Sequence, residues 1–586
     1  MNKVVKSLAP ILKRAILSGR LFKAKAELVK PIEDVLREWD VIVKVSVGSV
    51  ILLNIFKSKK ALAEDKALPV IMCAHPYDNH LVPALGKTPL KGAAQQYRII
   101  DQVGKPKFST VTSWESPDPN FWVGKDYIVV NMNMPGFAGS TGDATTFGRN
   151  QSRAYYDVIE WVAEQQWCDG NVGLNGVSFL AITQYHVAAC RDYENKPPKA
   201  LKCISPWEGI TDMYRDLSNL GGIPQDGFPS FWWATEVKPA MTGDPKLFVE
   251  RHGGVPAEWL KGYPFFDEFW EEKRAPVENI EIPILTCVSF SDVGLHSNGA
   301  YRSFTDVKSK DKWMYTHRGG KWDVYYSKEV QKLTLKFMDY YLKGEKDNGW
   351  DETPRVRLEV RSSRDKIHEI RSENEWPIAR TKYEKYYLQK ANKLALGKTN
   401  QSNEISYHGK KGSWVFKITF QEDTELTGHA MLNIWMSLRS SNKNLDDFNV
   451  YTVLNKYDKK NKRVPFYGTV GNANDVITRG YMRAALRELD EEKSTEVIPY
   501  QSFKRYRKLH SGEEVCLKIP FPLTSVFFHA GEILELMIAS YEVFQNAPMF
   551  KDNTLNKGGK QVIHLGGKYD SFLQLPVIPK YTNGSR

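Results

Sequence analysis

Residues 41–342 alternate between short apolar, β-branched runs and longer segments with helical spacing, and this alternation strongly constrains the fold. Apolar residues recur every three or four positions in the segments 153–167, 179–190 and 328–342, which predicts helices. The predicted strands lie at residues 41–47, 49–56, 69–74, 127–131, 171–175, 201–205, 283–289 and 312–316. Alternating strands and helices are typical of a parallel sheet covered by helices, so the sequence predicts an α/β domain.

Two further parts interrupt and follow this pattern. The stretch between the strands at 201–205 and 283–289 is rich in aromatic residues and too long for an ordinary loop, so we expect it to fold as a cap. Beyond the polar segment KGEKDNGWDETP, short β-rich runs between turn signals predict a β-sandwich. The predicted parts are an α/β domain at 41–206 and 281–345, a helical cap at 207–280 and the sandwich at 354–586.

Residues 1–40 form a basic N-terminal extension. Its first 30 residues hold eight Lys or Arg and one acid, Glu27, and the apolar residues between 8 and 16 follow helical spacing. A basic amphipathic helix can lie on a membrane surface, carry organelle targeting or contact a partner chain. An extension packed on its own protein is the interpretation we favour. A homo-oligomer is compatible with the sequence.

Charge and cysteine content limit the other partners and the compartment. The net charge of +12 is mild for 586 residues, and no recognition motif accompanies the scattered Lys and Arg, so no nucleic-acid partner is expected. No run approaches the roughly 20 apolar residues of a membrane span. The cysteines lack metal-finger spacing and are expected to be buried and reduced, which, with no signal peptide recognised, predicts a cytoplasmic protein. They are Cys73, Cys168, Cys190, Cys203, Cys287 and Cys516.

The segment GLNGVSFLA at residues 173–181 lies where a predicted strand ends and a predicted helix begins. A nucleophilic serine on such a turn needs small neighbours, and Gly176 and Ala181 supply them around Ser178. Leu180 breaks the common G-x-S-x-G form, so an ordinary serine after a glycine is the alternative. Ser178 is the candidate nucleophile.

A serine becomes nucleophilic when a histidine takes its proton and a carboxylate orients that histidine. In α/β-hydrolases these partners follow the serine in the order acid, then histidine, each after a later strand. Asp292 follows the strand at 283–289 and His317 follows the strand at 312–316, so they are the predicted acid and base. His296 competes as the base, but it lies in the same predicted loop as Asp292, and we favour His317. Ordinary loop roles for both residues are the alternatives.

The oxyanion of the intermediate also needs hydrogen-bond donors, and losing one typically costs about 10²–10³ in rate. The backbone N–H of Phe179 is one candidate. The hydroxyl of Tyr77, which follows the strand at 69–74, is a second, although a buried tyrosine with a purely structural role is equally compatible.

Many segments, in order, resemble those of the cocaine esterase and X-Pro dipeptidyl-peptidase-like acyl hydrolases (CocE/NonD type). They include HPYDNH (75–80), PGFAGSTG (135–142), SPWEGITDMYRD (205–216), SFSDVGLHSNG (289–299), ITRGYMRAALRELD (477–490) and HLGGKYDSFLQLPVIP (564–579). The resemblance implies an α/β-hydrolase domain with a helical cap insertion, followed by a C-terminal jelly-roll β-sandwich. It also implies Ser178 as nucleophile, Asp292 as acid, Tyr77 with Phe179 as oxyanion hole, and His317 as base, with no metal or organic cofactor.

Two departures from the family pattern bear on the site. The usual Asp-x-Arg-Gly appears as Asn-Met-Pro-Gly at 133–136, so an ion pair is absent or replaced. Members that act on α-amino esters are expected to place carboxylates just after the acid, whereas Asp292 is followed by Val-Gly-Leu. A buried ammonium needs a counter-charge, so amino-ester and dipeptidyl-peptidase activity are disfavoured. The aromatic cap instead suggests an apolar or aromatic acyl or alcohol group, although such tryptophans more often form the core of the cap itself. Trp207 is the aromatic residue expected nearest the pocket, since it follows the strand at 201–205.

The sequence therefore predicts a serine hydrolase that cleaves a small-molecule carboxylic ester, less readily an amide, through an acyl-enzyme. An acyltransferase would use the same residues, and an X-Pro dipeptidyl-peptidase-type aminopeptidase is a further alternative. A glycan-binding protein with an inert core is the least favoured, because Ser178, Asp292 and His317 are all present.

Overall fold

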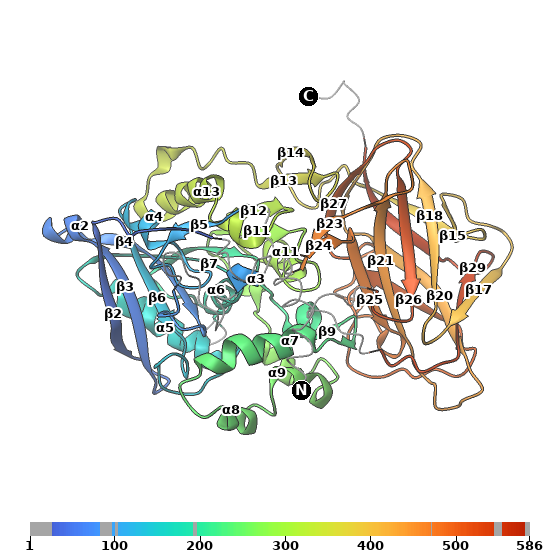
Figure 1. Cartoon of the computed structure of the whole chain (residues 1–586), viewed down its shortest axis with the longest axis horizontal. Coiled ribbons are helices and arrows are strands. Elements are labelled where there is room, and N and C mark those ends of the chain that lie inside the picture. Colours follow the sequence, from blue (N-terminus) through green and yellow to red (C-terminus); the bar gives the residue numbers. More distant parts are fainter. Residues whose placement is uncertain are drawn as a thin grey trace.

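The computed structural model describes residues 26–82, 96–99, 104–190, 196–469, 472–543 and 554–579. This part of the chain is elongated, with an α/β region at one end and a strand-rich region at the other (Figure 1). The predicted N-terminal amphipathic helix lies outside the described residues. Within the predicted extension, β1 (Glu27–Val29) pairs with β5 (Lys107–Ser109), and β2 begins at Val35. The described part of the extension therefore consists of β-strands that belong to the α/β region.

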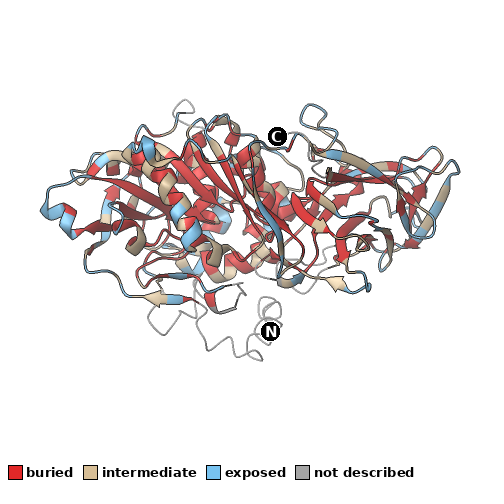
Figure 2. Ribbon diagram, turned by 90° about the horizontal axis from the view of Figure 1, so that it is seen from above, coloured by how far each residue is buried: buried red, intermediate tan, exposed pale blue. Residues whose placement is uncertain are grey.

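One large sheet forms the α/β region. Its strands, in spatial order, are β2 (Val35–Lys44), β3 (Val50–Ser58), β6 (Ile128–Asn133), β4 (Leu68–His75), β7 (Cys168–Val177), β8 (Leu201–Trp207), β11 (Ile284–Ser289), β12 (Lys312–His317) and β13 (Val356–Arg361). The strands from β6 to β13 are parallel, so their carboxyl ends meet at one edge. These strands are almost wholly buried, which explains their continuous apolar runs (Figure 2).

Helices cover this sheet. The larger ones are α5 (Arg149–Ala163), α6 (Phe179–Ala189), α11 (Ser297–Thr305) and α13 (Lys328–Met338), and the short ones are α2 (Lys59–Ala63), α3 (Gln96–Ile99), α4 (Pro119–Val123) and α12 (Lys321–Tyr325). The short turns η8 (Asp339–Lys343) and η9 (Lys346–Asn348) follow α13. Helix α5 is amphipathic and buries one stripe, whereas α6 is apolar all round and buries every residue except His186. The α/β architecture predicted from the sequence is confirmed.

The insertion between β8 and β11 is mainly helical. It contains η4 (Tyr214–Ser218), β9 (Asn219–Leu220), β10 (Ile223–Pro224), α7 (Gly227–Trp232), η5 (Trp233–Val237), η6 (Lys238–Ala240), α8 (Pro245–Arg251), α9 (Pro256–Gly262), α10 (Glu268–Lys273) and η7 (Val277–Asn279). Its tryptophans at 232, 233, 259 and 270 are buried, so much of the aromatic content forms the core of the insertion itself.

The C-terminal region consists mainly of β-strands. They are β14 (Ile367–Glu373), β15 (Lys382–Gln389), β16 (Lys393–Ala395), β17 (Asn403–His408), β18 (Ser413–Thr419), β19 (Thr424–Gly428), β20 (Met431–Arg439), β21 (Asn449–Tyr457), β22 (Arg463–Val464), β23 (Phe466–Gly468), β24 (Asn472–Asp475), β25 (Thr478–Arg483), β26 (Val515–Pro520), β27 (Thr524–Phe528), β28 (Ile533–Ala539), β29 (Lys560–Leu565) and β30 (Phe572–Ile578), with the turn η11 (Ala484–Leu486). The order β18–β28–β21–β25 forms one antiparallel sheet, and β20 pairs with β26, β29 and β30 in another. Phe416 and Leu536 of the first share a buried core with Ile434 and Leu517 of the second.

The strand β13 belongs to a different region from the one predicted for it. The run at 355–360 was expected to open the C-terminal sandwich, but β13 continues the parallel sheet through pairing of Val356 with Met314 of β12. The turn-rich segment before it connects α13 to a further strand of the same sheet rather than to a separate domain.

The cysteines and the helices bear on two other expectations. All six thiols are free, and five are buried, while Cys516 is partly exposed. No helix within the described ranges combines the length and the apolar character needed to cross a membrane.

Candidate active site

Ser178 stands on a strained turn between β7 and α6, at the carboxyl edge of the sheet. Its backbone has φ 60° and ψ −115°, and its N–H donates to the Trp207 carbonyl at 3.0 Å. A Cβ at Gly176 would lie 2.6 Å from the Leu180 Cβ, so only glycine fits there. Strain of this kind concentrates at functional sites, and it projects the serine out of the sheet.

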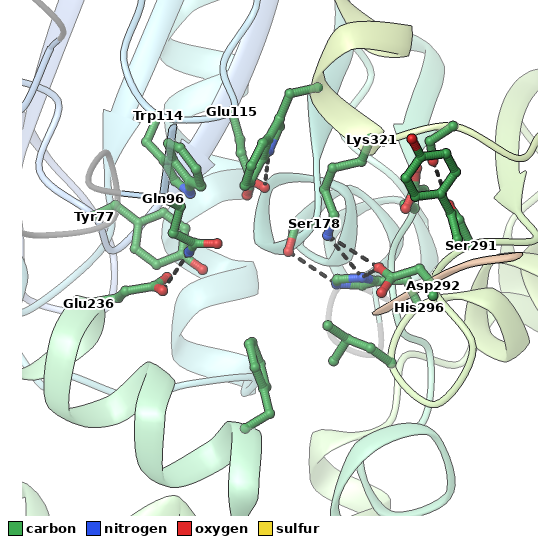
Figure 3. Close-up of a pocket in the computed structure, with 18 residues that line it drawn as sticks. Tyr77, Gln96, Trp114, Glu115, Ser178, Glu236, Ser291, Asp292, His296 and Lys321 are labelled. Carbon is green, nitrogen blue, oxygen red and sulfur yellow. Dashed lines mark hydrogen bonds and ion pairs between the residues drawn. The ribbon is translucent and has the colours of Figure 1, made fainter. Parts of the chain in front are cut away.

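His296, not His317, contacts Ser178. The Ser178 Oγ lies 3.1 Å from His296 Nε2, and His296 Nδ1 is hydrogen-bonded to Asp292 Oδ2 (Figure 3). The Leu295 and His296 N–H groups both donate to the Asp292 carbonyl at 3.2 Å, and Gly294 has a left-handed φ of 89°. This tight turn at the start of α11 places the imidazole back over the carboxylate, since residues four apart meet on one helical face.

His317 lies elsewhere, and the prediction that it meets Ser178 is wrong. It is the last residue of β12, in register with Ser289, and its Nε2 is 2.8 Å from Glu208 Oε1. Both side chains are buried, and His317 is paired with Glu208 rather than with Ser178. The D-x-x-x-H spacing of Asp292 and His296 just before a helix is the sequence signal that could have identified His296.

Lys321 is a site residue that sequence reasoning missed. It begins α12, just after the loop that leaves β12, and its Nζ lies 3.2 Å from Asp292 Oδ2 and 3.3 Å from His296 Nδ1. Burial opposes ionisation of Asp292, but Lys321 and His296 hold the pKa of that carboxyl below its usual range. Burial lowers the pKa of His296, and Lys321 lowers it further against the opposing effect of Asp292. The imidazole is therefore neutral and able to accept a proton.

The two candidate oxyanion donors lie beside Ser178. Tyr77 is buried, lines the pocket, and flanks Ser178 on the side opposite His296 (Figure 3). Its hydroxyl accepts a hydrogen bond from Trp232 Nε1 at 2.9 Å and keeps its own proton to donate. Burial, then Glu236 and Glu115, raise the pKa of Tyr77. The Phe179 N–H, in the first turn of α6, has no intrahelical acceptor.

Four carboxyl groups line the pocket, which has a free volume of about 40 Å³. Besides Asp292 they are Glu115, Glu208 and Glu236. Burial raises the pKa of Glu115 to about 7, against the lowering effect of Lys321. Burial also raises the pKa of Glu236, which accepts a hydrogen bond from Gln96. The loop after Asp292 lacks a carboxylate as expected, but other elements supply several.

Trp207 does not line the pocket. It is fully buried at the end of β8, where its ring packs against Tyr315, His317 and Tyr325. Its backbone carbonyl accepts the hydrogen bond from the Ser178 N–H. The aromatic residues that do line the pocket are Tyr77, Trp114, Phe228, Trp322 and Tyr467.

Amide hydrogen bonds surround Asn133, where the sequence led us to expect an ion pair to be absent or replaced. Asn133 Oδ1 accepts from the Asn79 N–H at 3.0 Å, and Asn133 Nδ2 donates to the Ala138 carbonyl at 3.1 Å. These bonds join the loop that carries Tyr77 to the glycine-rich turn after β6. The loop is thus held by neutral groups.

Among the described residues, two groups of side chains near the site have metal-ligand spacing: Glu208 with Cys287 and His317, and Glu208 with Asp292 and His296. Burial raises the pKa of Cys287 well above its usual range, and the neutral thiol is not the form that binds metals. In the second group His296 already bonds both Asp292 and Ser178. The donor chemistry fits proton transfer better than metal binding.

A serine on a strand–helix turn, bonded to a histidine that is bonded to a carboxylate, is the arrangement that serine hydrolases of the α/β-hydrolase type use. The family model of X-Pro dipeptidyl-peptidase (S15 family) matches residues 60–322, and that of the X-Pro dipeptidyl-peptidase C-terminal non-catalytic domain matches residues 348–574. A crystal structure of a CocE/NonD family hydrolase from Staphylococcus aureus has a TM-score of 0.82 and 32% identity, covering 93% of this chain and 94% of that one. The chain belongs to this family of CocE/NonD, X-Pro dipeptidyl-peptidase-like hydrolases.

More distant relatives share parts of the chain or the fold alone. Cocaine esterase from Rhodococcus sp. (strain MB1 Bresler) is 26% identical over 329 residues, which are 47% of this chain and 55% of that protein. The matched stretch thus spans about half of the curated relative. An α-amino acid ester hydrolase is 15% identical with a TM-score of 0.66, covering 93% of this chain and 97% of that one, and shows the common fold.

Proposed function

We propose that this protein cleaves a carboxylic ester through an acyl-enzyme, with Ser178 as nucleophile, His296 as general base and Asp292 as the acid that orients it. The observation that carries the proposal is the 3.1 Å contact between Ser178 Oγ and His296 Nε2, with Nδ1 of the same ring on Asp292. His296 thereby replaces His317, the base expected from the sequence.

The proposed reaction follows from these contacts. His296 takes the Ser178 proton as Oγ attacks the carbonyl carbon, and Asp292 stabilises the imidazolium that forms. The negative charge on the carbonyl oxygen is stabilised by the Tyr77 hydroxyl and the Phe179 N–H. His296 then donates its proton to the departing alcohol, and a water activated by the same imidazole releases the acid.

The pocket walls favour a substrate with an apolar group next to the ester. Trp114 and Trp322 come from the α/β region, Phe228 from the helical insertion and Tyr467 from the C-terminal region. Aromatic side chains of this kind bind apolar or aromatic acyl and alcohol groups through their large surfaces.

Hydrolysis of p-nitrophenyl esters of increasing acyl length tests the proposal. We expect the wild-type protein to turn over these esters and to react covalently at Ser178 with a fluorophosphonate, and Ser178→Ala to do neither. Retained hydrolysis in Ser178→Ala, or modification at another residue, would exclude this mechanism.

A second substrate class is favoured by the acidic pocket wall. A substrate ammonium, as in an α-amino ester or the N-terminus of a peptide, would find Glu236 and Glu115 within the pocket, although both carboxyls have raised pKa values in the empty site. Binding of a cation would favour their ionised forms. The lack of a carboxylate in the loop after Asp292 therefore does not exclude amino-acyl substrates.

Paired esters separate the two classes. We expect Glu236→Gln to lower kcat/KM for an α-amino acyl ester more than for its N-acetylated form if the ammonium binds there. Equal effects on the two esters would leave the neutral ester as the substrate class.

We also propose a division of the chain into an α/β-hydrolase domain, a helical cap at 207–280 and a C-terminal jelly-roll sandwich. The helical content between β8 and β11 and the two antiparallel sheets support it. Because β13 pairs with β12, we propose that the first domain extends to at least residue 361.

A further inference from the structure

Asp292 has few partners for a buried carboxylate. Its Oδ2 is shared by His296 Nδ1 and the Lys321 ammonium, while Oδ1 has no hydrogen-bond partner among the described residues. Its side chain is 3% exposed, so solvent supplies little compensation. An ionised carboxylate in such a place needs an opposite charge, and Lys321 is that charge.

Lys321 is fixed at this position by the loop that carries it. Ser291 Oγ, next to Asp292, donates to the Gly319 carbonyl, which ties the loop after β11 to the loop after β12. Gly320 is the N-cap of α12, and Lys321 is its first residue, with a side chain only 12% exposed. Burial opposes the charge on Lys321, but Asp292, Glu208 and Glu115 raise its pKa above the usual range. The ammonium is therefore ionised.

We infer that Lys321 is a positioning residue of this hydrolase, whose ammonium anchors Asp292 and keeps His296 in the neutral form that accepts the Ser178 proton. The inference rests on the proposed function, because it assigns a role to the same site. Lys321 acts on His296 in two ways: by holding Asp292 and by the charge of its own ammonium. It takes no part in making or breaking bonds.

The charges around His296 give the direction of the effect. Asp292 faces the ring from its own loop, Lys321 from α12 and Glu208 from the end of β8. The two carboxylates favour the imidazolium, and the ammonium, 3.3 Å from Nδ1, opposes it. Glu115 and Glu236 interact electrostatically with Lys321. They therefore affect the His296 ring only indirectly, through the charge of Lys321. Removal of the ammonium leaves an imidazole surrounded by carboxylates, so it would bind a proton at higher pH.

The test compares Lys321→Met, which keeps an unbranched side chain of nearly the same length without the charge, with Lys321→Arg, which keeps the charge. We expect Lys321→Met to move the acidic limb of the kcat/KM profile to higher pH by roughly one unit. At pH 7, kcat should fall by about 10- to 100-fold through misplacement of the base, with a smaller change in KM. Lys321→Arg should keep the limb near its wild-type position. Lys273→Met removes another buried lysine, in α10 of the insertion, and should leave the profile unchanged.

A second readout does not depend on turnover. The pKa of His296 can be followed by NMR in ¹³C-histidine-labelled full-length protein, with the signal assigned by its loss in His296→Gln. A rise in this pKa in Lys321→Met, and not in Lys273→Met, is the expected result. An unchanged His296 pKa and acidic limb in folded Lys321→Met would overturn the inference. Failure of the wild type to hydrolyse esters or to react at Ser178 would instead overturn the proposed function.

Discussion

Glu115 illustrates how burial tunes single residues in this pocket. Its side chain is buried and accepts a hydrogen bond from Trp322 Nε1 at 2.8 Å, and its pKa is raised to about 7. The folded protein therefore binds this proton more tightly than the unfolded chain does. Stability must fall as the pH rises from about 4.5 to about 7, because the unfolded chain ionises first.

Replacement of this carboxyl by an amide should remove that loss. Glu115→Gln keeps the acceptor for Trp322, so we expect it to be stabilised relative to wild type by up to about 3 kcal/mol at pH 8 and by much less at pH 4.5. Thermal midpoints of both proteins across this range give the comparison. A difference between the two midpoints that does not change with pH would show that folding leaves the pKa of Glu115 unchanged.

The sequence was informative about residues whose role depends on local pattern. Ser178 was predicted from a strand–helix junction with a glycine two positions earlier, and Asp292 from its place after a strand. His296 is the less favoured base in the sequence because it shares a predicted loop with Asp292, whereas in the structure a helical turn there folds its ring onto Asp292. Lys321 had no signal at all, since its partners lie on a different loop.

The turn between β7 and α6 shows how one element depends on a single small residue. Gly176 adjoins the Leu180 side chain so closely that any Cβ would clash, while Gly170, on the same strand, has open space around the position of a Cβ. Both have positive φ, so the two positions differ mainly in crowding.

Paired alanine substitutions isolate that crowding. Gly176→Ala should destabilise the protein by about 1–3 kcal/mol and lower ester hydrolysis, because the strand and helix must separate. Gly170→Ala serves as the control and should cost about 1 kcal/mol from backbone strain, with activity retained. Thermal unfolding and ester turnover measure both effects. Similar losses of activity in the two variants would argue against a special role for the turn.

Elements were predicted well where their patterns are strong. The parallel strands and the helices α5, α6 and α13 lie close to the predicted ranges, because buried strands and amphipathic helices have distinct periods. The role of β13 was missed because its apolar run resembles those that follow it, and only pairing with β12 assigns it to the α/β sheet. The prediction that Trp207 lies nearest the pocket is wrong, because its position at the end of a strand fixes only its backbone near the site. The side chain can face either surface of the sheet, and it packs against Tyr315.

At the scale of the whole molecule, the C-terminal strand region completes the site. Tyr467 and Gly468 of β23 line the pocket, and Thr469 Oγ1 donates to the Val293 carbonyl, in the turn between Asp292 and His296. Thr469 is buried, so this bond links the region directly to the loop that carries the acid and the base.

Removal of this link should affect turnover more than stability. Thr469→Val keeps the shape but leaves the Val293 carbonyl unpaired, and we expect a loss of about 1 kcal/mol in stability together with a lower kcat. Thr452→Val removes a comparable buried bond to the Gly480 carbonyl within the C-terminal region and is the matched control. Equal kcat values for the two variants would mean that the C-terminal region does not position the loop.

The most direct test of the site compares the buried histidine that contacts Ser178, His296, with the one that contacts Glu208, His317. Covalent labelling of Ser178 by a fluorophosphonate needs the base but not a particular substrate. We expect His296→Gln to slow labelling by about 10³ or more, since loss of a triad histidine removes most of the activation. His317→Gln, which can still donate to Glu208, should label at a rate close to wild type. Normal labelling of His296→Gln together with loss of labelling in His317→Gln would contradict the assignment.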